Sequence, residues 1–516
     1  MSFLKSESYR RGLVYSVFFN ALARVLGFAA SLAIAYYFGA GVETDIYFYC
    51  IFSAGLMAGF ASNLNSAVLI PESMRLTGRH GEQHSREFLN GFLYAFLALG
   101  VAMSIIGFLF PVQLFSVLSR FSREALEQHR SILLLSVPIF TLMKISNYLS
   151  DILVSRKFFT MPMIAGLVVN GAVLLFIFLL GPKWGAASMA GGMLLAHAFN
   201  IALMVWLMRA QLGWNFRLKK VQLAAHVPKN VIFSQLGSAT AVLSSYVPIF
   251  LLSGYGSGTV SSLNFGRQVA ELPNSLLTQQ ASSVSGIKFN EMSANHDGAG
   301  LDRAFHTAAS ALVFALVPVA VAGCYFAPEV IGLLFKRGRF GVEAVKLSAD
   351  FMRVFLLAVP FNAVSTLVSR LFMAEQKVSQ SFWYQFAYNA VLLLAALFLI
   401  RETGVLGYPA AILMMQVINL PACIFLLRRY APQVNYLSAL SRLWRLAIYE
   451  SALFFPVAVA DALLLHNLPL IPRMIVACTA YMLALLFFNR HMALEPESRS
   501  LILRVLHMRR AKAVEE

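Results

Sequence analysis

Ionisable side chains stand inside several long apolar runs of this chain, where charge is costly. One charged residue at the centre of a bilayer costs roughly 2.5–3.5 kcal/mol on insertion scales, so such residues usually serve binding or transport. Arg24 lies in the middle of the first run, and Arg267 and Glu271 lie four residues apart, on one helical face, in a later one. Guanidinium groups bind phosphate or carboxylate oxygens in pairs. A cleft lined by Arg24 and Arg267, with Glu271 beside it, therefore predicts an anionic substrate; a purely structural pair is the alternative for Arg267 and Glu271.

A second set of ionisable residues lies in or at the ends of other runs. Lys144 and Asp151 are seven residues apart, which again places them roughly on one helical face. Asp45 opens a run, Arg370 closes one, and Asp461 lies in a late one. For these last three the favoured interpretation is that the side chains reach the membrane interface along their own apolar stems. Asp45 is nevertheless kept as a candidate substrate-binding residue, and the other four as secondary candidates.

Signatures of catalysis and of cofactors do not occur in the sequence. We find no phosphate-binding glycine loop, no nucleophile elbow and no His/Glu metal pattern. The four cysteines lie in or beside apolar runs without ligand spacing, so neither a zinc site nor a disulfide framework is expected. The chain is therefore predicted not to be an enzyme and to use no metal or cofactor. Coupling to the membrane potential or to a monovalent cation is compatible with its in-span carboxylates, Asp45, Asp151, Glu271 and Asp461.

The composition is that of a membrane protein. Of 516 residues, 59% are hydrophobic and only 13% are charged, against roughly 25% charged in soluble proteins. Apolar runs of about 20 residues recur, each long enough to cross a bilayer as a helix. The net charge of +17 does not indicate nucleic acid as a partner, because the cations occupy short loops where they meet anionic lipids. We expect an all-α polytopic membrane protein.

The chain repeats itself. At one constant offset, Asn170, Gly185, Asn200 and Arg209 recur as Asn389, Gly404, Asn419 and Arg428. At a nearly equal offset, Arg86, Phe88 and Pro111 recur as Arg303, Phe305 and Pro328. Duplicated helical bundles are typical of secondary transporters, which hold their substrate between the two halves.

The repeat predicts how the chain is divided. The expected parts are a first six-helix lobe (1–209), a basic linker (210–229), a second six-helix lobe (230–428), two further helices (429–489) and a basic cytoplasmic tail (490–516). We expect the linker to be amphipathic and to lie on the inner leaflet, or to be a plain loop.

Fourteen spans fit the hydrophobic pattern, and their loops predict the topology. The spans are expected near 12–38, 46–70, 88–112, 131–155, 160–181, 186–208, 230–253, 260–287, 304–327, 351–373, 380–400, 406–427, 444–465 and 468–488. With both termini in the cytoplasm, the loops on that side hold 26 Lys and Arg and the opposite loops ten. This bias places both termini inside. The basic loop Lys336-Arg337-Gly338-Arg339 and its repeat counterpart around Arg120 then face outward, which we interpret as a structural feature of the outer face.

The motifs in three regions resemble the MurJ/MviN family of lipid II flippases. Ala23-Arg24-Val25-Leu26-Gly27-Phe28-Ala29, followed by Phe38-Gly39-Ala40-Gly41 and Thr44-Asp45, is similar to the opening of that family. Asn264–Pro273 resembles its arginine-bearing helix, and Leu334–Phe340 its short outer-loop motif. The resemblance covers nearly the full length, although the architecture is also shared with polysaccharide flippases and multidrug exporters.

The resemblance implies two six-helix lobes, alternating access and export of an undecaprenyl-diphosphate-linked sugar across the bacterial inner membrane. Arg24 and Arg267 would bind the diphosphate or nearby acidic groups, and Asp45 would belong to a gate or ion pair. The last two helices, 444–488, would form a groove for the lipid tail. Cell-envelope glycan assembly enzymes would be its partners.

Two departures from the family pattern keep other cargoes open. Ala30 stands where the family usually has a further arginine, and Leu56–Gly59 is uncharged where the family carries basic residues. An exopolysaccharide, capsule or O-antigen unit is therefore the alternative cargo. A multidrug cation antiporter would need acidic residues in the cleft, a non-transporting scaffold would tolerate neutral replacement of Arg24 and Arg267, and a membrane glycosyltransferase would need a catalytic constellation in a large outer loop.

Overall fold

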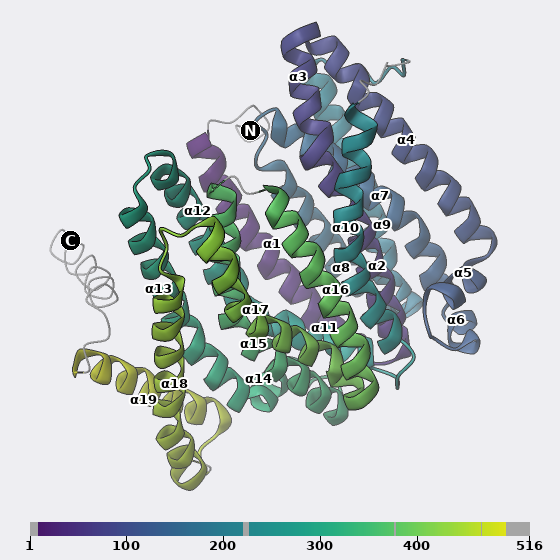
Figure 1. The fold of residues 1–516 in the computed structure, drawn as a ribbon. Coiled ribbons are helices and arrows are strands. Elements are labelled where there is room, and N and C mark those ends of the chain that lie inside the picture. Colours follow the sequence, from purple (N-terminus) through teal and green to yellow (C-terminus); the bar gives the residue numbers. More distant parts are fainter. Residues whose placement is uncertain (1–8, 220–225, 376–377, 466, 492–516) are drawn as a thin grey trace, which may run out of the picture. The chain divides into compact units, whose positions relative to one another are not determined.

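The structure is a computed structural model that describes residues 9–219, 226–375, 378–465 and 467–491. Within these ranges all regular structure is helical (Figure 1). No water is available in a bilayer to satisfy an exposed backbone group, so a spanning segment must satisfy its own, as a helix does. Eleven described segments are long and apolar enough to cross a membrane. The predicted all-α polytopic fold is confirmed.

The expected number of fourteen spans stays a prediction. The pair 380–400 and 406–427 falls within one apolar stretch, Phe382–Tyr430, whose two helices meet at a short 3₁₀ turn. The span expected at 230–253 contains a shorter apolar helical stretch, Ser238–Leu252. The span expected at 260–287 is interrupted by a π-helical turn, Asn274–Thr278, and does not count among the eleven.

The chain divides into two compact units. The first comprises residues 1–264 together with 334–345, and the second comprises 265–333 together with 346–516. The helices of the first unit are α1 (Tyr9–Phe38), α2 (Val42–Leu64), η2 (Asn65–Leu69), α3 (Ile70–His80), α4 (Glu82–Leu109), α5 (Pro111–Leu118), α6 (Arg123–Gln128), α7 (Arg130–Ser155), α8 (Met161–Trp184), α9 (Ala187–Leu212) and α10 (His226–Leu252). Within it α8 packs on α1 and α9, α7 packs on α2, α4 and α9, and α10 packs on α2.

Helix α11 (Thr259–Ala270) runs from the first unit into the second. The second unit continues with η3 (Asn274–Thr278), α12 (Gln279–Ala294), α13 (Gly298–Tyr325), α14 (Ala327–Phe335), α15 (Val342–Ala374), α16 (Val378–Thr403), η4 (Gly404–Leu406), α17 (Gly407–Tyr430), α18 (Tyr436–Ala460), η5 (Asp461–Leu465) and α19 (Leu470–His491). Here α16 packs on α17, and α18 packs on α13 and α19. The repeat boundaries expected from the sequence are not the boundaries of these units, and the pair of six-helix lobes stays a prediction.

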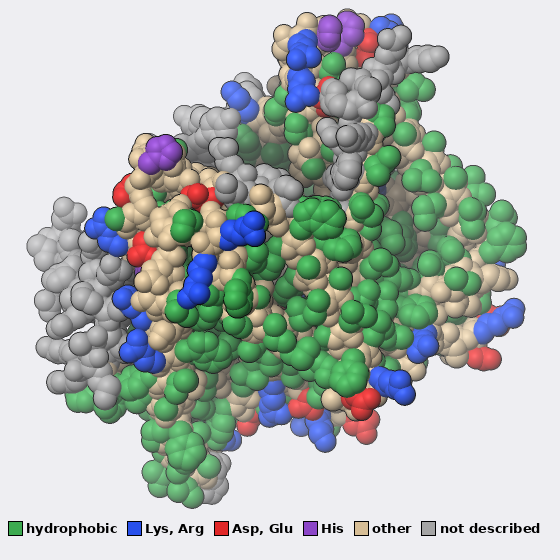
Figure 2. All heavy atoms as spheres, viewed as in Figure 1, with side chains coloured by type: hydrophobic (Ala, Val, Ile, Leu, Met, Phe, Trp, Pro, Cys, Tyr) green, Lys and Arg blue, Asp and Glu red, His purple; other side chains and the backbone are tan. Residues whose placement is uncertain are grey.

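The surface of α4 is that of a lipid-facing helix. Leu99, Met103, Ile105 and Ile106 are each more than half exposed. In Figure 2 hydrophobic side chains cover the flank of α4, whereas Lys, Arg and His side chains gather at the tip where α3 and α4 meet. An apolar flank with charged ends matches a hydrocarbon layer bounded by water.

The described part of the linker is not the amphipathic helix that we considered. Helix α9 ends at Leu212, and residues 213–219 run without helix across α4. The Asn90 amide donates to the carbonyls of Asn215 (2.7 Å) and Arg217 (3.2 Å), and the Tyr94 hydroxyl donates to Phe216 (2.7 Å). The Trp214 indole in turn donates to Asn90 (2.9 Å). We call residues 213–219 the strap; residues 220–225 and the tail from 492 lie outside the described residues.

Candidate functional site

Arg24 stands on α1 beside the face that packs on α8. Ala23 and Gly27 form that face: the Asn170 amide donates to the Ala23 carbonyl at 2.9 Å, and a Cβ on Gly27 would lie 3.2 Å from the same amide. Arg24 follows Ala23 by about 100° around the helix, so it lies to one side of this packed seam, and it is half-buried. One turn farther on the same face, Phe28 contacts Phe335 with ring centroids 6.2 Å apart.

Asp45 is buried at the start of α2 and holds the first turn of α11. Its carboxylate accepts hydrogen bonds from the Gly258 and Ser261 amides and from the Ser261 hydroxyl, all at 2.7 Å. A carboxylate at this position pairs the free N–H groups of the helix and complements its dipole. The interpretation that Asp45 reaches the interface is wrong, because its side chain is only 2% exposed and its bonds run inward.

Arg267 follows Ser261 by six residues on α11, about 9 Å along the axis. Its guanidinium donates to the Glu271 carboxylate at 2.6 Å and lies over the Phe355 ring, 5.9 Å from the centroid. The predicted shared face is confirmed, and the ion pair that we gave as the structural alternative is present. About a third of the Arg267 side chain and half of the Glu271 side chain are exposed, so both remain accessible to a ligand.

Arg24 belongs to the first unit and Arg267 to the second. Each is described within its own unit, and their convergence on one cleft stays a prediction.

Lys144 and Asp151 are both hydrogen-bonded to Asn65, a residue that the sequence interpretation missed. The Lys144 ammonium donates to the Asn65 side-chain oxygen at 3.1 Å, and the Asn65 amide donates to Asp151 at 2.6 Å. Lys144 also lies over the Phe96 ring, 4.1 Å from its centroid. Asn65 is fully buried and begins the π-helical turn η2. A buried charge needs such partners, so the predicted shared face of Lys144 and Asp151 is confirmed and Asn65 completes the cluster.

The second unit carries a chain of neutral polar side chains that sequence reasoning also missed. The Asn362 amide donates to Asn274 at 3.4 Å, Gln416 donates to Asn362 at 3.2 Å, and Ser365 links Gln416 to Asn419. A search of the apolar runs for Asn and Gln side chains could have identified this row of hydrogen-bonded residues, and it could also have identified Asn65.

Asp461 is fixed by an ion pair and does not reach the interface, contrary to our interpretation. Its fully buried carboxylate accepts both Nε (2.9 Å) and Nη2 (2.5 Å) of Arg473 and the Tyr325 hydroxyl (2.9 Å). This bidentate arrangement ties the α18–α19 hairpin to the end of α13. Arg370 is half-buried and packs against Gly286 of α12. Their side chains therefore have structural contacts, and a role in substrate binding stays a prediction for both.

Glu450 on α18 is a further acidic residue that the sequence interpretation passed over. Its side chain is fully buried, and neither carboxylate oxygen has a hydrogen-bond partner among the described residues. The neighbouring α19 supplies Tyr481, whose hydroxyl donates to the backbone carbonyl of Glu450 at 2.8 Å and not to its carboxylate.

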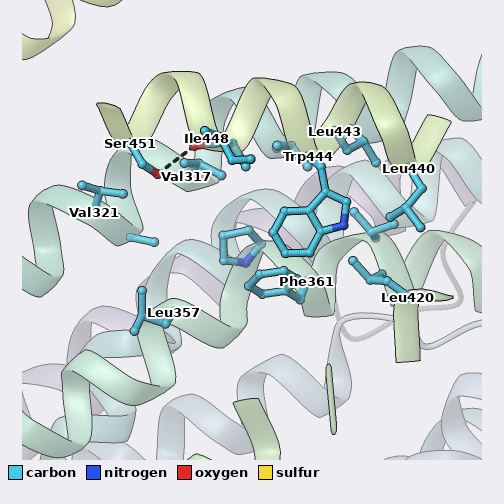
Figure 3. Close-up of a pocket in the computed structure, with 15 residues that line it drawn as sticks. Val317, Val321, Leu357, Phe361, Leu420, Leu440, Leu443, Trp444, Ile448 and Ser451 are labelled. Atoms are coloured by element: carbon cyan, nitrogen blue, oxygen red, sulfur yellow. Dashed lines mark hydrogen bonds between the residues drawn. The ribbon is translucent and has the colours of Figure 1, made fainter. Parts of the chain in front are cut away.

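A large apolar cavity opens along α18 (Figure 3). It measures about 320 Å³, within the usual range of about 300–1,000 Å³ for ligand pockets. The Trp444 indole projects into it and packs against Phe361 of α15, with ring centroids 5.7 Å apart. Helices α13, α15 and α17 complete its wall with residues such as Val317, Leu357 and Leu420, and α19 does not line it. This wall suits an aliphatic chain, although only one of the two helices expected to form a groove takes part.

Charged side chains inside apolar helices, together with an apolar cavity between them, are typical of multi-pass membrane proteins that bind or transport a ligand. A sequence model of the family described as "Lipid II flippase MurJ" matches residues 34–496. The chain therefore belongs to the MurJ family of lipid II flippases, and the resemblance drawn from its motifs is confirmed.

Individual relatives agree with this assignment. The "Probable lipid II flippase MurJ" of Aquifex aeolicus is 23% identical over 377 residues, which cover 72% of this chain and 73% of the relative. That of Borreliella burgdorferi is 20% identical over 408 residues, covering 76% and 77%.

Solved structures share the fold. One titled "Lipid II flippase MurJ, inward closed conformation" has a TM-score of 0.76 at 17% identity, covering 93% of this chain and 99% of that chain. An inward-facing multidrug resistance MATE transporter has a TM-score of 0.62 at 18% identity, covering 82% and 94%. At sequence identities this low, structural similarity establishes that the fold is shared but does not identify the transported substrate.

Proposed function

We infer that this protein is a flippase that moves lipid II across the bacterial inner membrane by alternating access, and that it is not an enzyme. The observation that carries this inference is the family match over residues 34–496, nearly the whole chain. Both curated relatives compared above carry the name of a lipid II flippase, so an exopolysaccharide or O-antigen unit is not the favoured cargo. The likeness to a multidrug transporter extends to the fold alone.

Three parts of the chain receive roles in this proposal. Arg24 and Arg267 bind the diphosphate and the acidic groups of the head, since guanidinium forks match phosphate oxygens. Asp45 belongs to a gate: its bonds to Gly258 and Ser261 join the start of α2 to the start of α11. Breaking these bonds would separate the second helices of the two sequence repeats.

The termini lie in the cytoplasm in this proposal. The bias of Lys and Arg between the two sets of loops supports it. An inside-negative potential then favours outward movement of an anionic head by about 2.3 kcal/mol per charge per 100 mV. Glycan assembly enzymes that use the exported head would act on the outer side. A reporter that is active only in the cytoplasm, fused after Glu516, tests the orientation.

Rescue of cells depleted of their own lipid II flippase tests the proposed function. We expect the wild-type chain to restore growth and to restore lipid II on the outer face, measured by labelling with a reagent that cannot cross the membrane. Good membrane expression without rescue would contradict lipid II as the cargo.

The cavity along α18 is proposed to hold the lipid tail. Replacing Ala447 with tryptophan places an indole in a cavity of about 320 Å³ beside Trp444. We expect this variant to lower lipid II delivery about tenfold or more, because the tail then loses most of its contact area with the wall. Delivery per molecule of flippase, at matched expression, measures the effect.

The matched control is Val459→Phe, which adds bulk on the same helix at a partly exposed position outside the cavity. It should leave delivery unchanged. Full delivery of lipid II by Ala447→Trp would show that the lipid tail does not occupy this cavity.

A further inference from the structure

Two loops grip the ends of two helices in the first unit, and the pair is related by the sequence repeat. The segment 334–345 is placed in that unit although its neighbours in sequence are not. It lies on the carboxyl end of α1. The loop after α5, residues 118–122, lies on the carboxyl end of α10. At the repeat offset that relates Arg86 to Arg303, Leu118 corresponds to Phe335 and Arg120 to Arg337.

The first grip is between the loop after α5 and α10. The Arg120 amide donates to the Ser253 hydroxyl at 2.8 Å, and the Tyr246 hydroxyl donates to the Leu118 carbonyl at 2.5 Å. The Arg120 guanidinium lies over the Phe250 ring, 5.7 Å from its centroid. A Cβ on Gly254 would lie only 2.8 Å from the Cβ of Arg120, so the close approach requires glycine there.

The second grip is between segment 334–345 and α1. The Arg339 amide donates to the Tyr36 carbonyl at 3.0 Å. Gly338 and Gly39 both have positive φ. A Cβ on Gly338 would lie 2.1 Å from the Tyr36 carbonyl oxygen, and a Cβ on Gly39 would lie 2.4 Å from the Arg339 carbonyl oxygen. Phe335 contacts Phe28 farther along α1. Two glycines thus interlock with the backbone opposite them.

The acceptors of the two grips correspond in the sequence repeat, and the donors, Arg120 and Arg339, differ by two positions from exact correspondence. Tyr36, which accepts the bond in the second grip, corresponds at the same repeat offset to Ser253, which accepts it in the first. Each loop therefore holds the first helix of the opposite repeat at the same helical position. Both loops are basic: Lys336, Arg337 and Arg339 are exposed between the buried Phe335 and Phe340.

We propose that these two loops form a reciprocal clasp that closes the outer end of the cargo path and must release in each transport cycle. The clasp consists of residues 118–122 against 246–254 and of residues 334–340 against 28–39. The proposal rests on the proposed function and goes beyond Asp45, because the clasp uses other residues: the hydroxyls of Ser253 and Tyr246 in the first grip, and backbone and glycine contacts in the second. The turn that Asp45 holds lies next to the second grip, since a Cβ on Gly258 would lie 3.0 Å from the Ala40 carbonyl oxygen that follows α1.

Paired cysteines test the clasp in the full-length protein. In a background in which Cys50, Cys324, Cys423 and Cys478 are replaced and rescue is retained, one variant carries R120C with S253C and a second carries Y36C with R339C, so that every glycine of the clasp is kept. In each pair the two residues are already joined by a hydrogen bond, from the Arg120 amide to the Ser253 hydroxyl at 2.8 Å and from the Arg339 amide to the Tyr36 carbonyl at 3.0 Å, which brings their Cα atoms to about the 4.4–6.8 Å of a disulfide. The control pair, S104C with T141C, joins α4 to α7 within one repeat, where the hydroxyl oxygens are 3.2 Å apart.

We expect all three pairs to form a disulfide in membranes, measured by peptide mass spectrometry. When about 90% of molecules are crosslinked, lipid II delivery should fall about tenfold for either clasp pair, because only unlocked molecules complete the cycle. Reduction should restore it, and the control pair should deliver normally throughout. Full delivery by a crosslinked clasp pair, or failure of both clasp pairs to crosslink while the control does, would overturn the proposal.

A measurement that needs no cargo separates this proposal from the proposed function. In purified protein, Gly338→Ala should speed amide hydrogen exchange in 36–45 and 334–345, because the added Cβ forces the loop off the Tyr36 carbonyl. Gly341→Ala is the matched control, since nothing lies within 4 Å of a Cβ there. Unchanged exchange in Gly338→Ala would overturn the clasp even if lipid II is carried. Absence of lipid II delivery from the reduced protein, with the exchange result as expected, would contradict only the cargo.

Discussion

Alanine at Arg24 or at Arg267 is expected to abolish rescue of flippase-depleted cells. Each guanidinium is proposed to bind the diphosphate head, and a charge-assisted hydrogen bond in a site of low dielectric contributes about 1.5–3 kcal/mol. Loss of two such bonds from either side chain lowers delivery about a hundredfold or more. Growth and outer-face lipid II at matched expression measure it. Arg267→Ala also removes the partner of Glu271, which is 2.6 Å away.

The controls separate head binding from folding. Glu271→Gln keeps Arg267 and removes the carboxylate that competes with phosphate for it, so this variant should still deliver lipid II. Arg123→Ala breaks an exposed pair with Glu127 outside the proposed site and should behave as wild type. Normal rescue by both Arg24→Ala and Arg267→Ala would remove the arginines from the mechanism and leave a scaffold as the better hypothesis.

Asparagine at Asp45 is expected to stop transport nearly as completely. Asp45 accepts three hydrogen bonds from Gly258 and Ser261, and an amide can accept only through its one oxygen. Its NH₂ group would then face a backbone N–H, donor against donor. Each lost bond to a charged acceptor is worth about 1.5–3 kcal/mol, which shifts the balance of closed and open gates by about tenfold or more.

Delivery of lipid II and labelling of the outer face by an impermeant reagent together measure this result. Asp45→Asn should lose delivery and gain labelling near the start of α11. Ser261→Ala removes only the hydroxyl contact and leaves both backbone donors paired, so a milder loss is expected. If Asp45→Asn delivers at the wild-type rate, the bonds of Asp45 do not serve a gate.

The fold and part of the site follow from local patterns that a sequence displays directly. Runs of apolar residues specify spanning helices because lipid offers no other partner for the backbone. Spacings of four and seven residues place Arg267 with Glu271, and Lys144 with Asp151, on common faces. These relations lie within single helices, where geometry is set by residue number alone.

What the sequence does not reveal are contacts between segments far apart in the chain. Asp45 and Asp461 were expected to reach the interface, yet their partners Ser261 and Arg473 come from other helices and draw them inward. Asn65 carries no charge, so a search for ionisable residues passes over it. The strap was expected to be a helix or a plain loop because its partner, Asn90, is a neutral residue more than a hundred positions earlier.

The strap also limits how far the two repeats can move apart. It is fixed to α4 as far as Lys219, and α10 begins at His226, so seven peptide links join the strap to the first helix of the second repeat, which the proposed transport cycle would move. A fully extended chain covers about 3.3–3.6 Å per residue, which gives a reach of about 25 Å. The first residue of α10 can therefore travel only within that radius. The length of this covalent connection, and not only the shape of the cargo, therefore limits how far the two repeats could rock apart in the proposed cycle.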